Sequence, residues 1–389
     1  MKFIVDRNKL LQAMQHTKIM MKRSPMLWAN TYELKVQGDK LRISGTNGTI
    51  FITESLQLEG SSSNERDTPF YVHNSLLGAI KTLEQQPLEF IVGEYQLTVR
   101  HQYGYFRVPM VDTTYPEAKQ LKEKDETIHV RMEAPGLYSQ MSKVAFAAAD
   151  DELRPVLSGI YIEVESDHIN FVASNGHILM RLAKHCQEPN KQTCSFIIPR
   201  DVANTILRIL PKTGYCELVY LNNVARLVID DNLTITFVCI DGKYPSYRNV
   251  FPTEFNITFS VERKRLLKTL SRLRLFSSLV SSSVKFALSK AGHEQLTLST
   301  KHLDEGEIAQ ENIPCEFTKG SGKFKEGILI RIPYLTSILN VLPSENVVFH
   351  AVDSVRVCAL TPQPTSDLEE LTALVMPLMQ SDTDNFESL

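Results

Sequence analysis

Leu41-Arg-Ile-Ser-Gly-Thr-Asn-Gly-Thr-Ile-Phe-Ile52 is the stretch that decides how this 389-residue chain folds. Apolar residues alternate with polar ones on both sides of an Asn-Gly pair, and this pattern predicts a β-hairpin with a tight turn. The pattern returns 128 residues later, where Ile169–Met180 reads Ile-Asn-Phe-Val-Ala-Ser-Asn-Gly-His-Ile-Leu-Met. Self-similarity at a long, fixed spacing indicates an internal repeat.

Two further landmarks recur in the same order. Asp112-Thr-Thr-Tyr-Pro116 matches Asp241-Gly-Lys-Tyr-Pro245 at an offset of 129 residues. Apolar residues with helical spacing recur at 76–83, 202–210 and 335–342, each after a short extended stretch. A first helix is predicted in each unit from three aligned triplets of residues: Leu10, Leu11 and Met14; Leu137, Tyr138 and Met141; Leu266, Leu267 and Leu270.

Each unit therefore reads strand, helix, several strands, helix, several strands, which predicts an α+β fold built from three tandem domains. The third unit lacks the Asn-Gly hairpin and is identified by order and spacing. Charged residues at 122–126 and the stretch 252–255 predict boundaries that give domains 1–124, 125–253 and 254–389, the last with a tail at 381–389. The alternative is an ordinary α+β protein whose hairpins are similar by coincidence.

Composition narrows the class of protein. The chain is 43% apolar and 22% charged, which argues against a disordered protein. Asp6 and Arg7 interrupt the start before any signal-peptide core could form, and no apolar run is long enough to span a bilayer, so we expect a soluble, cytoplasmic protein. The six cysteines form no Cys-x-x-Cys pair, which favours buried reduced thiols over disulfides or a zinc site.

The sequence contains no recognisable constellation for catalysis. Zinc-protease, nucleophile-elbow and dinucleotide motifs are absent, and the ten histidines are scattered. His177 lies beside an Asn-Gly turn and is a candidate for binding, without an evident catalytic partner. We therefore expect neither an enzyme nor a bound cofactor or metal.

Positive charge is concentrated on the predicted helices although the net charge is −3. The stretch 261–274 carries six basic residues and one acidic residue, whereas 366–389 carries six acidic residues and no basic one. Local fields, rather than the total charge, attract phosphates, so equivalent helices on one surface would contact DNA without reading its bases. The candidate DNA-facing residues are Lys9, Lys18, Lys22, Arg23, Lys81, Arg208, Arg263, Lys264, Lys268, Arg272 and Arg274. Solvated helix faces are the alternative for any one of them.

Three motifs give the chain a family resemblance. Ser174-Asn-Gly-His177, Asp241-Gly-Lys-Tyr-Pro-Ser-Tyr-Arg248 and Val375-Met-Pro-Leu378 resemble the bacterial DNA polymerase III beta subunit family, the sliding clamps, as does the opening Met1-Lys2-Phe3. The resemblance runs from Met1 to about Gln380. It implies a non-enzymatic processivity factor that forms a head-to-tail homodimeric ring around double-stranded DNA. Twelve helices of about 10 Å diameter would line a channel roughly 120 Å in circumference.

The resemblance also implies a pocket between the second and third domains for a short peptide of the polymerase III alpha subunit, the clamp loader or other partners. Ile178, Asn249 and Met379 stand where the family commonly has arginine, so we expect a less basic rim. The pocket residues, carried over position by position, are Leu157, Ser174, Gly176, His177, Leu179, Pro245, Val250, Tyr334, Val355, Val375, Met376, Pro377 and Leu378.

For ring closure, the family pairs an edge of its first domain with an edge of its third. This assigns Phe106 and Val108, on a strand-like run, and Phe276, after the basic helix, to the dimer interface. A further hypothesis concerns the tail 381–389, in which Phe386 or Leu389 would fold back and compete with partner peptides.

Two other classes of protein stay open at this point. One is a repeat-built protein scaffold without a nucleic-acid role, whose basic helix serves an acidic partner. The other is an enzyme whose site forms between domains. Retention on circular but not on linear DNA separates a clamp from a scaffold, and turnover that survives purification would indicate the enzyme.

Overall fold

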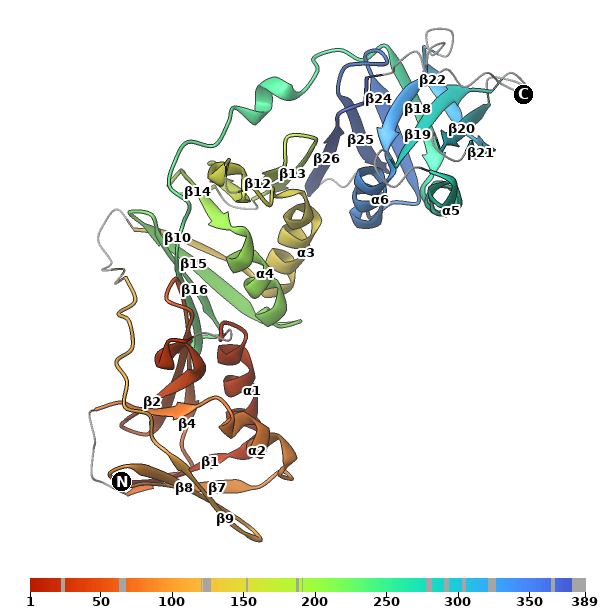
Figure 1. The fold of residues 1–389 in the computed structure, drawn as a ribbon. Coiled ribbons are helices and arrows are strands. Elements are labelled where there is room, and N and C mark those ends of the chain that lie inside the picture. The colour runs from red at the N-terminus through yellow and green to blue at the C-terminus, as the bar shows by residue number, and fades with distance from the viewer. Residues whose placement is uncertain are drawn as a thin grey trace. The chain divides into compact units, whose positions relative to one another are not determined.

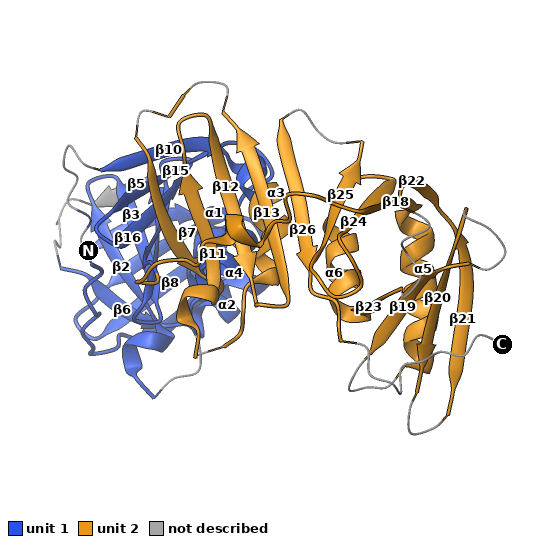
Figure 2. Cartoon of the chain, turned by 90° about the horizontal axis from the view of Figure 1, so that it is seen from above, with its two compact units in different colours: residues 1–138, 201–239 blue, residues 139–200, 240–389 orange. Residues whose placement is uncertain are grey.

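Two compact units make up the chain: residues 1–138 with 201–239, and residues 139–200 with 240–389 (Figure 2). Each unit holds one long sheet to which two successive repeats contribute, so the units follow the sheets rather than the repeats. The computed structural model describes residues 1–21, 25–62, 68–119, 121, 127–151, 153–186, 189–190, 192–277, 282–289, 294–302, 306–320, 327–364 and 368–379. Among these residues, no helix combines the length and apolarity needed to cross a membrane.

The first repeat begins with a strand that leads directly into a helix, and it continues through two further runs of strands (Figure 1). The Asp6 carboxylate accepts a hydrogen bond from the Lys9 backbone amide and so caps the first helix. The elements are β1 (Lys2–Asp6), α1 (Arg7–Lys18), β2 (Thr31–Gln37), β3 (Lys40–Thr46), β4 (Ile50–Gln57), β5 (Gly60–Ser62), β6 (Phe70–His73), α2 (Leu76–Thr82), β7 (Pro87–Val92), β8 (Gln96–His101) and β9 (Gly104–Pro109).

The second repeat has the same order of elements, without a counterpart of β5 among the described residues. They are β10 (Ile128–Glu133), α3 (Ala134–Val144), β11 (Gly159–Val164), β12 (His168–Ser174), β13 (Ile178–His185), β14 (Cys194–Pro199), α4 (Arg200–Ile209), β15 (Tyr215–Leu221), β16 (Val224–Ile229) and β17 (Leu233–Val238). A single turn of 3-10 helix, Tyr247–Val250, follows in the segment that leads to the third repeat.

The third repeat repeats the order once more. Its elements are β18 (Ile257–Glu262), α5 (Arg263–Leu273), β19 (Ser283–Leu288), β20 (Gln295–Lys301), β21 (Ile308–Pro314), β22 (Glu316–Lys319), β23 (Ile328–Arg331), α6 (Ile332–Val341), β24 (Asn346–Ala351), β25 (Cys358–Gln363) and β26 (Glu369–Val375). All three predicted first helices and all three predicted second helices are therefore present. The prediction of three tandem α+β units is confirmed.

The pairing of strands obeys one rule in every repeat. The opening strand pairs with the first strand after the second helix, as in β1–β7, β10–β15 and β18–β24. The strands after the first helix form a separate antiparallel run, β6-β2-β3-β4, β14-β11-β12-β13 and β23-β19-β20-β21. Each repeat thus contributes two half-sheets. In the first repeat α1 packs beside α2, and in the third repeat α5 packs beside α6 (Figure 1).

Successive repeats are joined by antiparallel strand pairs, which we call seams. The first seam is β4–β17, which pairs Ile52 with Ile235 within the first unit. The second is β13–β26, which pairs Leu179 with Leu374 within the second unit. In both seams the last strand of one repeat pairs with the third strand after the first helix of the preceding repeat. This rule leaves β9 and β21 as open edges of their sheets.

The first helices bury most of the residues that their apolar spacing predicted, but Tyr138 in α3 is exposed. Leu10 and Met14 in α1, and Leu266 and Leu270 in α5, are almost completely buried. Each buried leucine of this kind stabilises the fold by roughly 2 kcal/mol. The prediction of buried thiols is confirmed for four of the six cysteines, whereas Cys186 and Cys194 are half-buried, and no disulfide joins any of the six.

Candidate functional site

The Asn-Gly turn of the second repeat is built in the same way as that of the first. The Asn175 side chain accepts hydrogen bonds from the amides of His177 and Ile178 at 2.9 and 3.0 Å, and the Ser174 hydroxyl donates to the Ile178 carbonyl at 2.8 Å. In the first repeat, the corresponding Asn47 and Thr46 make the equivalent bonds. Gly176 has a φ of +86°, which favours glycine. The predicted hairpins are therefore confirmed.

The turn presents His177 to the third repeat. Its exposed imidazole stacks on the ring of Tyr334 in α6, with centroids 5.6 Å apart and planes 19° from parallel. The His177 carbonyl accepts a hydrogen bond from the Met376 amide at 2.9 Å. Three of the predicted pocket residues are thus brought together from three distant parts of the sequence.

The β13–β26 seam decides which side chains reach the surface beside this turn. Leu179 and Leu374 pair across the seam and belong to one apolar cluster. Ile178 and Val375 also pair, but successive strand residues point to opposite faces, and both side chains are buried. Val375 is fully buried. The Ile178 side chain is likewise buried and adds no group to the rim. The expectation of a less basic rim stays a prediction.

The cluster around Leu179 is made of apolar and aromatic side chains. Half-buried Leu157 packs against it, as the pocket assignment requires. Tyr161 and Tyr244 stack at 4.6 Å and 9° over the same outer face of the sheet. The buried members are Val172, Leu179, Ile197, Tyr244, Tyr247, Ala359 and Leu374.

A cavity of about 660 Å³ adjoins this cluster, with which it shares Phe251 and Val357. Three predicted pocket residues line the cavity and are exposed, namely Val250, Val355 and Met376. We call this cavity and its lining the groove. Its complete lining is Asn249, Val250, Phe251, Pro252, Thr253, Glu254, Asn256, Val352, Val355, Arg356, Val357 and Met376.

The remaining pocket residues surround the groove and the cluster. Pro245 is exposed on the segment that carries Tyr244, and Pro377 is half-buried after Met376. The Leu378 amide donates to the Leu329 carbonyl at 2.8 Å, which holds the last described stretch against β23. Sequence reasoning missed Arg154, whose guanidinium hydrogen-bonds the Asn175 carbonyl at 3.4 Å and Asp151 at 2.9 Å. The rim therefore has a basic group that no motif indicated.

A polar network fastens the segment that carries Tyr244 and Val250. The Glu163 carboxylate accepts hydrogen bonds from the Tyr247 hydroxyl at 2.7 Å and from both terminal nitrogens of Arg248 at 2.8 and 3.0 Å. Asn170, which is fully buried, donates to the same carboxylate at 3.0 Å. Burial opposes ionisation of Glu163, but the bonds from Arg248, Tyr247 and Asn170 outweigh it and hold its pKa below the usual value.

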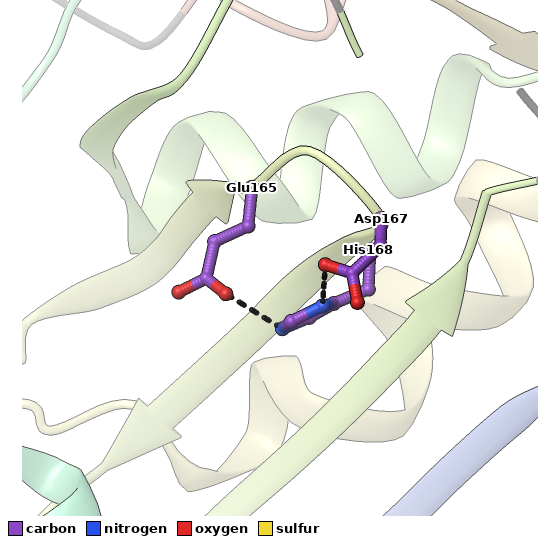
Figure 3. Close-up of side chains that lie close together, drawn as sticks. All are labelled: Glu165, Asp167 and His168. Carbon is purple, nitrogen blue, oxygen red and sulfur yellow. Dashed lines mark hydrogen bonds and ion pairs between the residues drawn. The ribbon is translucent and has the colours of Figure 1, made fainter. Parts of the chain in front are cut away.

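Beyond this network, three ionisable side chains meet at one turn (Figure 3). The His168 ring is 2.7 Å from an Asp167 oxygen through Nδ1 and 3.0 Å from a Glu165 oxygen through Nε2. Arg248 also contacts Glu165. Potential metal-ligand atoms from Glu165, Asp167 and His168 lie within 4.8 Å of one another. The hydrogen bonds to both ring nitrogens already account for this arrangement, and we assign it no metal.

The candidate DNA-facing residues are of two kinds: some are exposed, and others are bound to backbone carbonyls or to a carboxylate. Lys9, Lys18, Lys81, Arg208, Lys264, Lys268 and Arg274 are exposed, whereas Lys22 and Arg23 lie outside the described residues. Arg263 is half-buried, and it donates to the carbonyls of Ser344 and Leu339 at the end of α6. Arg7 binds the carbonyls of Ile80 and Lys81 at the end of α2 in the same way.

Arg272 is engaged with a carboxylate. Two of its nitrogens bind Glu311 at 2.6 Å each, and the hydrogen bond to Glu311 raises the pKa of Arg272. Within α5, Arg263 and Arg272 are therefore already engaged, whereas Lys264 and Lys268 are exposed.

The residues assigned to the dimer interface lie on two elements, one in each unit. Phe106 and Val108 are half-buried on β9, an edge strand of the first unit. Phe276 ends a short 3-10 helix after α5 in the second unit and is 42% exposed. Sequence reasoning missed its neighbour Leu275, which is 79% exposed. An apolar residue next to Phe276 was the signal that could have found it.

Known proteins match the chain along almost its full length. Profiles of the DNA polymerase III beta subunit match with the N-terminal domain at residues 1–117, the central domain at 132–246 and the C-terminal domain at 248–379. A "Beta sliding clamp" of Pseudomonas aeruginosa is 24% identical over 382 residues, covering 97% of this chain and all of the relative. Another, from Synechocystis, is 29% identical over 248 residues, covering 60% of this chain and 61% of the relative.

Solved structures share the fold. A DNA polymerase sliding clamp from Pseudomonas aeruginosa, solved with a ligand, superimposes with a TM-score of 0.88 at 22% identity over 98% of this chain and all of the other. The DNA polymerase III beta subunit from Thermotoga maritima gives a TM-score of 0.84 at 20% identity with the same coverage.

Three consecutive domain matches and a fold built from three tandem repeats define the class of protein as a DNA sliding clamp. Such a clamp is a processivity factor in DNA replication and has no catalytic site of its own. Within that class, the chain belongs to the DNA polymerase III beta subunit family.

Proposed function

We propose that two copies of the chain close head to tail into a ring through β9 of one copy and β21 of the other. The observation that carries this proposal is the seam rule. β9 corresponds to β17 and β26, and β21 corresponds to β4 and β13, so the two open edges are the unpaired halves of one more seam. Unpaired edge strands are a liability that proteins cover, and a third seam would cover both. Phe106 and Val108 would then pack near Phe276 and Leu275 of the other copy.

The ring would hold double-stranded DNA by encirclement, with the basic helix residues facing the duplex. A weak, mobile electrostatic surface suits this role, because tight contacts would stop sliding. Among the candidates, Lys9, Lys18, Lys81, Arg208, Lys264, Lys268 and Arg274 have the exposure that such contacts need. Lys22 and Arg23 remain candidates by sequence.

The groove and the adjoining cluster would bind a short peptide of a partner. Exposed Val250, Val355 and Met376 around a cavity of about 660 Å³ suit an apolar or aromatic anchor. His177 and Tyr334 offer a stacked aromatic wall, and Arg154 offers a positive charge at the rim. The alpha subunit of DNA polymerase III and the clamp loader are the partners we propose, in the cytoplasm. We also propose the domain limits 1–124, 125–253 and 254–389.

Retention on DNA without free ends tests encirclement. We expect the chain, loaded on a nicked circular plasmid by a bacterial clamp loader with ATP, to stay bound during gel filtration at constant salt. Cutting the plasmid once should release it, since the ring slides off an end. Equal release before and after cutting would contradict encirclement and favour a scaffold without a DNA role.

Charging the proposed edge tests ring closure. Phe106→Asp places a carboxylate where the third seam would bury it, and an unpaired buried charge costs several kcal/mol. Sedimentation velocity should therefore show a monomer where the unmodified chain shows a dimer. Tyr95→Asp is the matched control, because Tyr95 is exposed in the turn between β7 and β8. A dimer that survives Phe106→Asp would refute the assignment of this edge.

A further inference from the structure

The groove exposes apolar side chains, and the segment 380–389, which follows the last described residue, has a sequence suited to bind them. Val250, Val355 and Met376 are 46%, 53% and 42% exposed around one cavity. Exposed apolar side chains that gather around a concave surface mark a binding site more often than scattered ones do. Arg356 also lines this cavity, and its side chain is largely exposed.

The polypeptide leaves the described structure beside this groove. Met376 lines the cavity, and Met379, three residues later, is 83% exposed. Three residues span at most about 11 Å, so Met379 lies close to the groove. The next residues, 380–389, lie outside the described residues and read Gln-Ser-Asp-Thr-Asp-Asn-Phe-Glu-Ser-Leu. Phe386 is seven residues beyond Met379 and can reach about 24 Å from it.

The segment 380–389 has the chemistry of a groove ligand. Phe386 and Leu389 are its two large apolar residues, spaced three apart, as anchors of short recognition peptides often are. Asp384 and Glu387 flank Phe386, and the segment contains no Lys or Arg. The lining of the groove holds one basic residue, Arg356, and one acidic residue, Glu254. Arg356 pairs with Asp353, and Arg154 at the rim of the adjoining cluster pairs with Asp151, so the apolar anchors rather than net charge carry the fit to the groove.

We propose that the segment 380–389 binds the groove of its own chain, with Phe386 as the main anchor and Leu389 as the second, and so competes with partner peptides. This inference rests on the proposed peptide-binding function of the groove and adds a means of regulating it. A tether this short gives an effective concentration of roughly 1 mM. A segment with an intrinsic dissociation constant of about 0.1 mM would then occupy the groove most of the time and weaken a competitor about 10-fold.

A labelled synthetic peptide of residues 380–389 tests this contact directly. Its affinity is measured by fluorescence anisotropy for the full chain, for a chain ending at Met379, and for full chains with Phe386→Ala or Thr383→Ala. The chain ending at Met379 keeps every described residue and should fold normally. We expect it and Phe386→Ala to bind the probe about 10-fold more tightly than the full chain, whereas the Thr383→Ala control should match the full chain.

Two results would overturn the inference: no binding of the probe to the shortened chain, or affinities within twofold for all four proteins. Met376→Glu in the shortened chain should abolish probe binding, and unchanged binding would place the contact elsewhere and reject the proposal. If the contact forms within one chain, the masking is independent of protein concentration. Masking that grows with protein concentration would contradict the proposal.

A second measurement separates this inference from the proposed function. The alpha subunit of DNA polymerase III is titrated with the full and the shortened chain, and we expect about 10-fold tighter binding to the shortened one. Equal binding to both would overturn self-competition and leave the proposed groove function intact. Absence of binding to either would overturn the proposed function itself.

Discussion

Two segments with the same sequence motif lie on equivalent sheets, and they are fastened in different ways. Asp112–Pro116 follows the first repeat, and Asp241–Pro245 follows the second. Both begin alongside the same strand of their repeat: the Val111 amide donates to Tyr71 in β6, and the Ile240 amide donates to Ile197 in β14. Each motif tyrosine also stacks on a tyrosine of its sheet, at 5.4 Å for Tyr115 and 4.6 Å for Tyr244.

The difference lies in what the tyrosine hydroxyl does. The Tyr115 hydroxyl donates to the backbone carbonyl of Thr31 at 2.5 Å, with Ser44 as a second acceptor at 3.3 Å. The Tyr244 hydroxyl is buried and has no hydrogen-bond partner within the part of the chain that the structure describes. In the second segment, the hydrogen bonds to the sheet come from Tyr247, three residues after Tyr244, and from Arg248, and both side chains donate to Glu163.

The surroundings of the two segments also differ in polarity. The first segment borders a cavity of about 730 Å³ with many polar side chains, among them Glu33, Arg42 and Thr53. The second packs against an apolar cluster and ends at Val250 in the groove. The comparison teaches that the two repeats share the attachment of the segment to the sheet, whereas only the second segment has the ionic anchor on Glu163, which places an apolar surface beside an open groove.

Glu163→Gln should have the largest effect on this comparison, since it weakens the ionic anchor and leaves the first segment untouched. Arg248 and Tyr247 would lose a charged acceptor, and we expect a loss of about 1–2 kcal/mol at pH 7 after allowing for partial exposure. The measurement is the urea midpoint of unfolding. Glu165→Gln is the comparison variant: Glu165 receives only one nitrogen of Arg248 and otherwise contacts His168, so its loss should matter less.

The difference in stability between the unmodified chain and Glu163→Gln should depend on pH, and its sign follows from the pKa of Glu163. The pKa of Glu163 is depressed in the folded state, so its contribution to stability is present above the unfolded pKa of about 4.3 and is lost as pH falls through the lower folded value. The difference between the unmodified chain and Glu163→Gln should therefore shrink between pH 5 and pH 3. A difference that stays constant over this range would show that Glu163 does not act through its charge.

The sequence predicted the parts of this fold that depend on local patterns. The Asn47 and Asn175 turns, the six helices and the order of elements follow from periodicity and turn chemistry, which act over a few residues. The seams did not follow, because strand partners such as Leu179 and Leu374 are far apart in the chain. Without the seam, the two faces of β13 could not be told apart, so the burial of Ile178 beside Val375 did not follow from the sequence.

The candidate site shows the same limit. The resemblance indicated the residues that gather around the groove, but it did not indicate Arg154, whose partner Asn175 is 21 residues away. Arg263 was assigned to the DNA-facing group because it belongs to a basic run. Its guanidinium binds the Leu339 carbonyl, 76 residues away in the last turn of α6, where a cation stabilises the end of a helix. Charge counted along a helix does not show which cations are already engaged.

The two motif tyrosines provide the smallest and most direct test of the comparison. Tyr115→Phe removes the donor to the Thr31 carbonyl, and we expect a loss of about 1 kcal/mol in the free energy of unfolding. Tyr244→Phe removes a buried hydroxyl without a described partner, so stability should stay within about 0.5 kcal/mol or rise, because a desolvated donor is no longer unsatisfied. Both are measured by urea unfolding against the unmodified chain. Equal losses at the two positions would mean that the Tyr244 hydroxyl is satisfied in solution, by water for example, and that the second segment did not exchange one anchor for another.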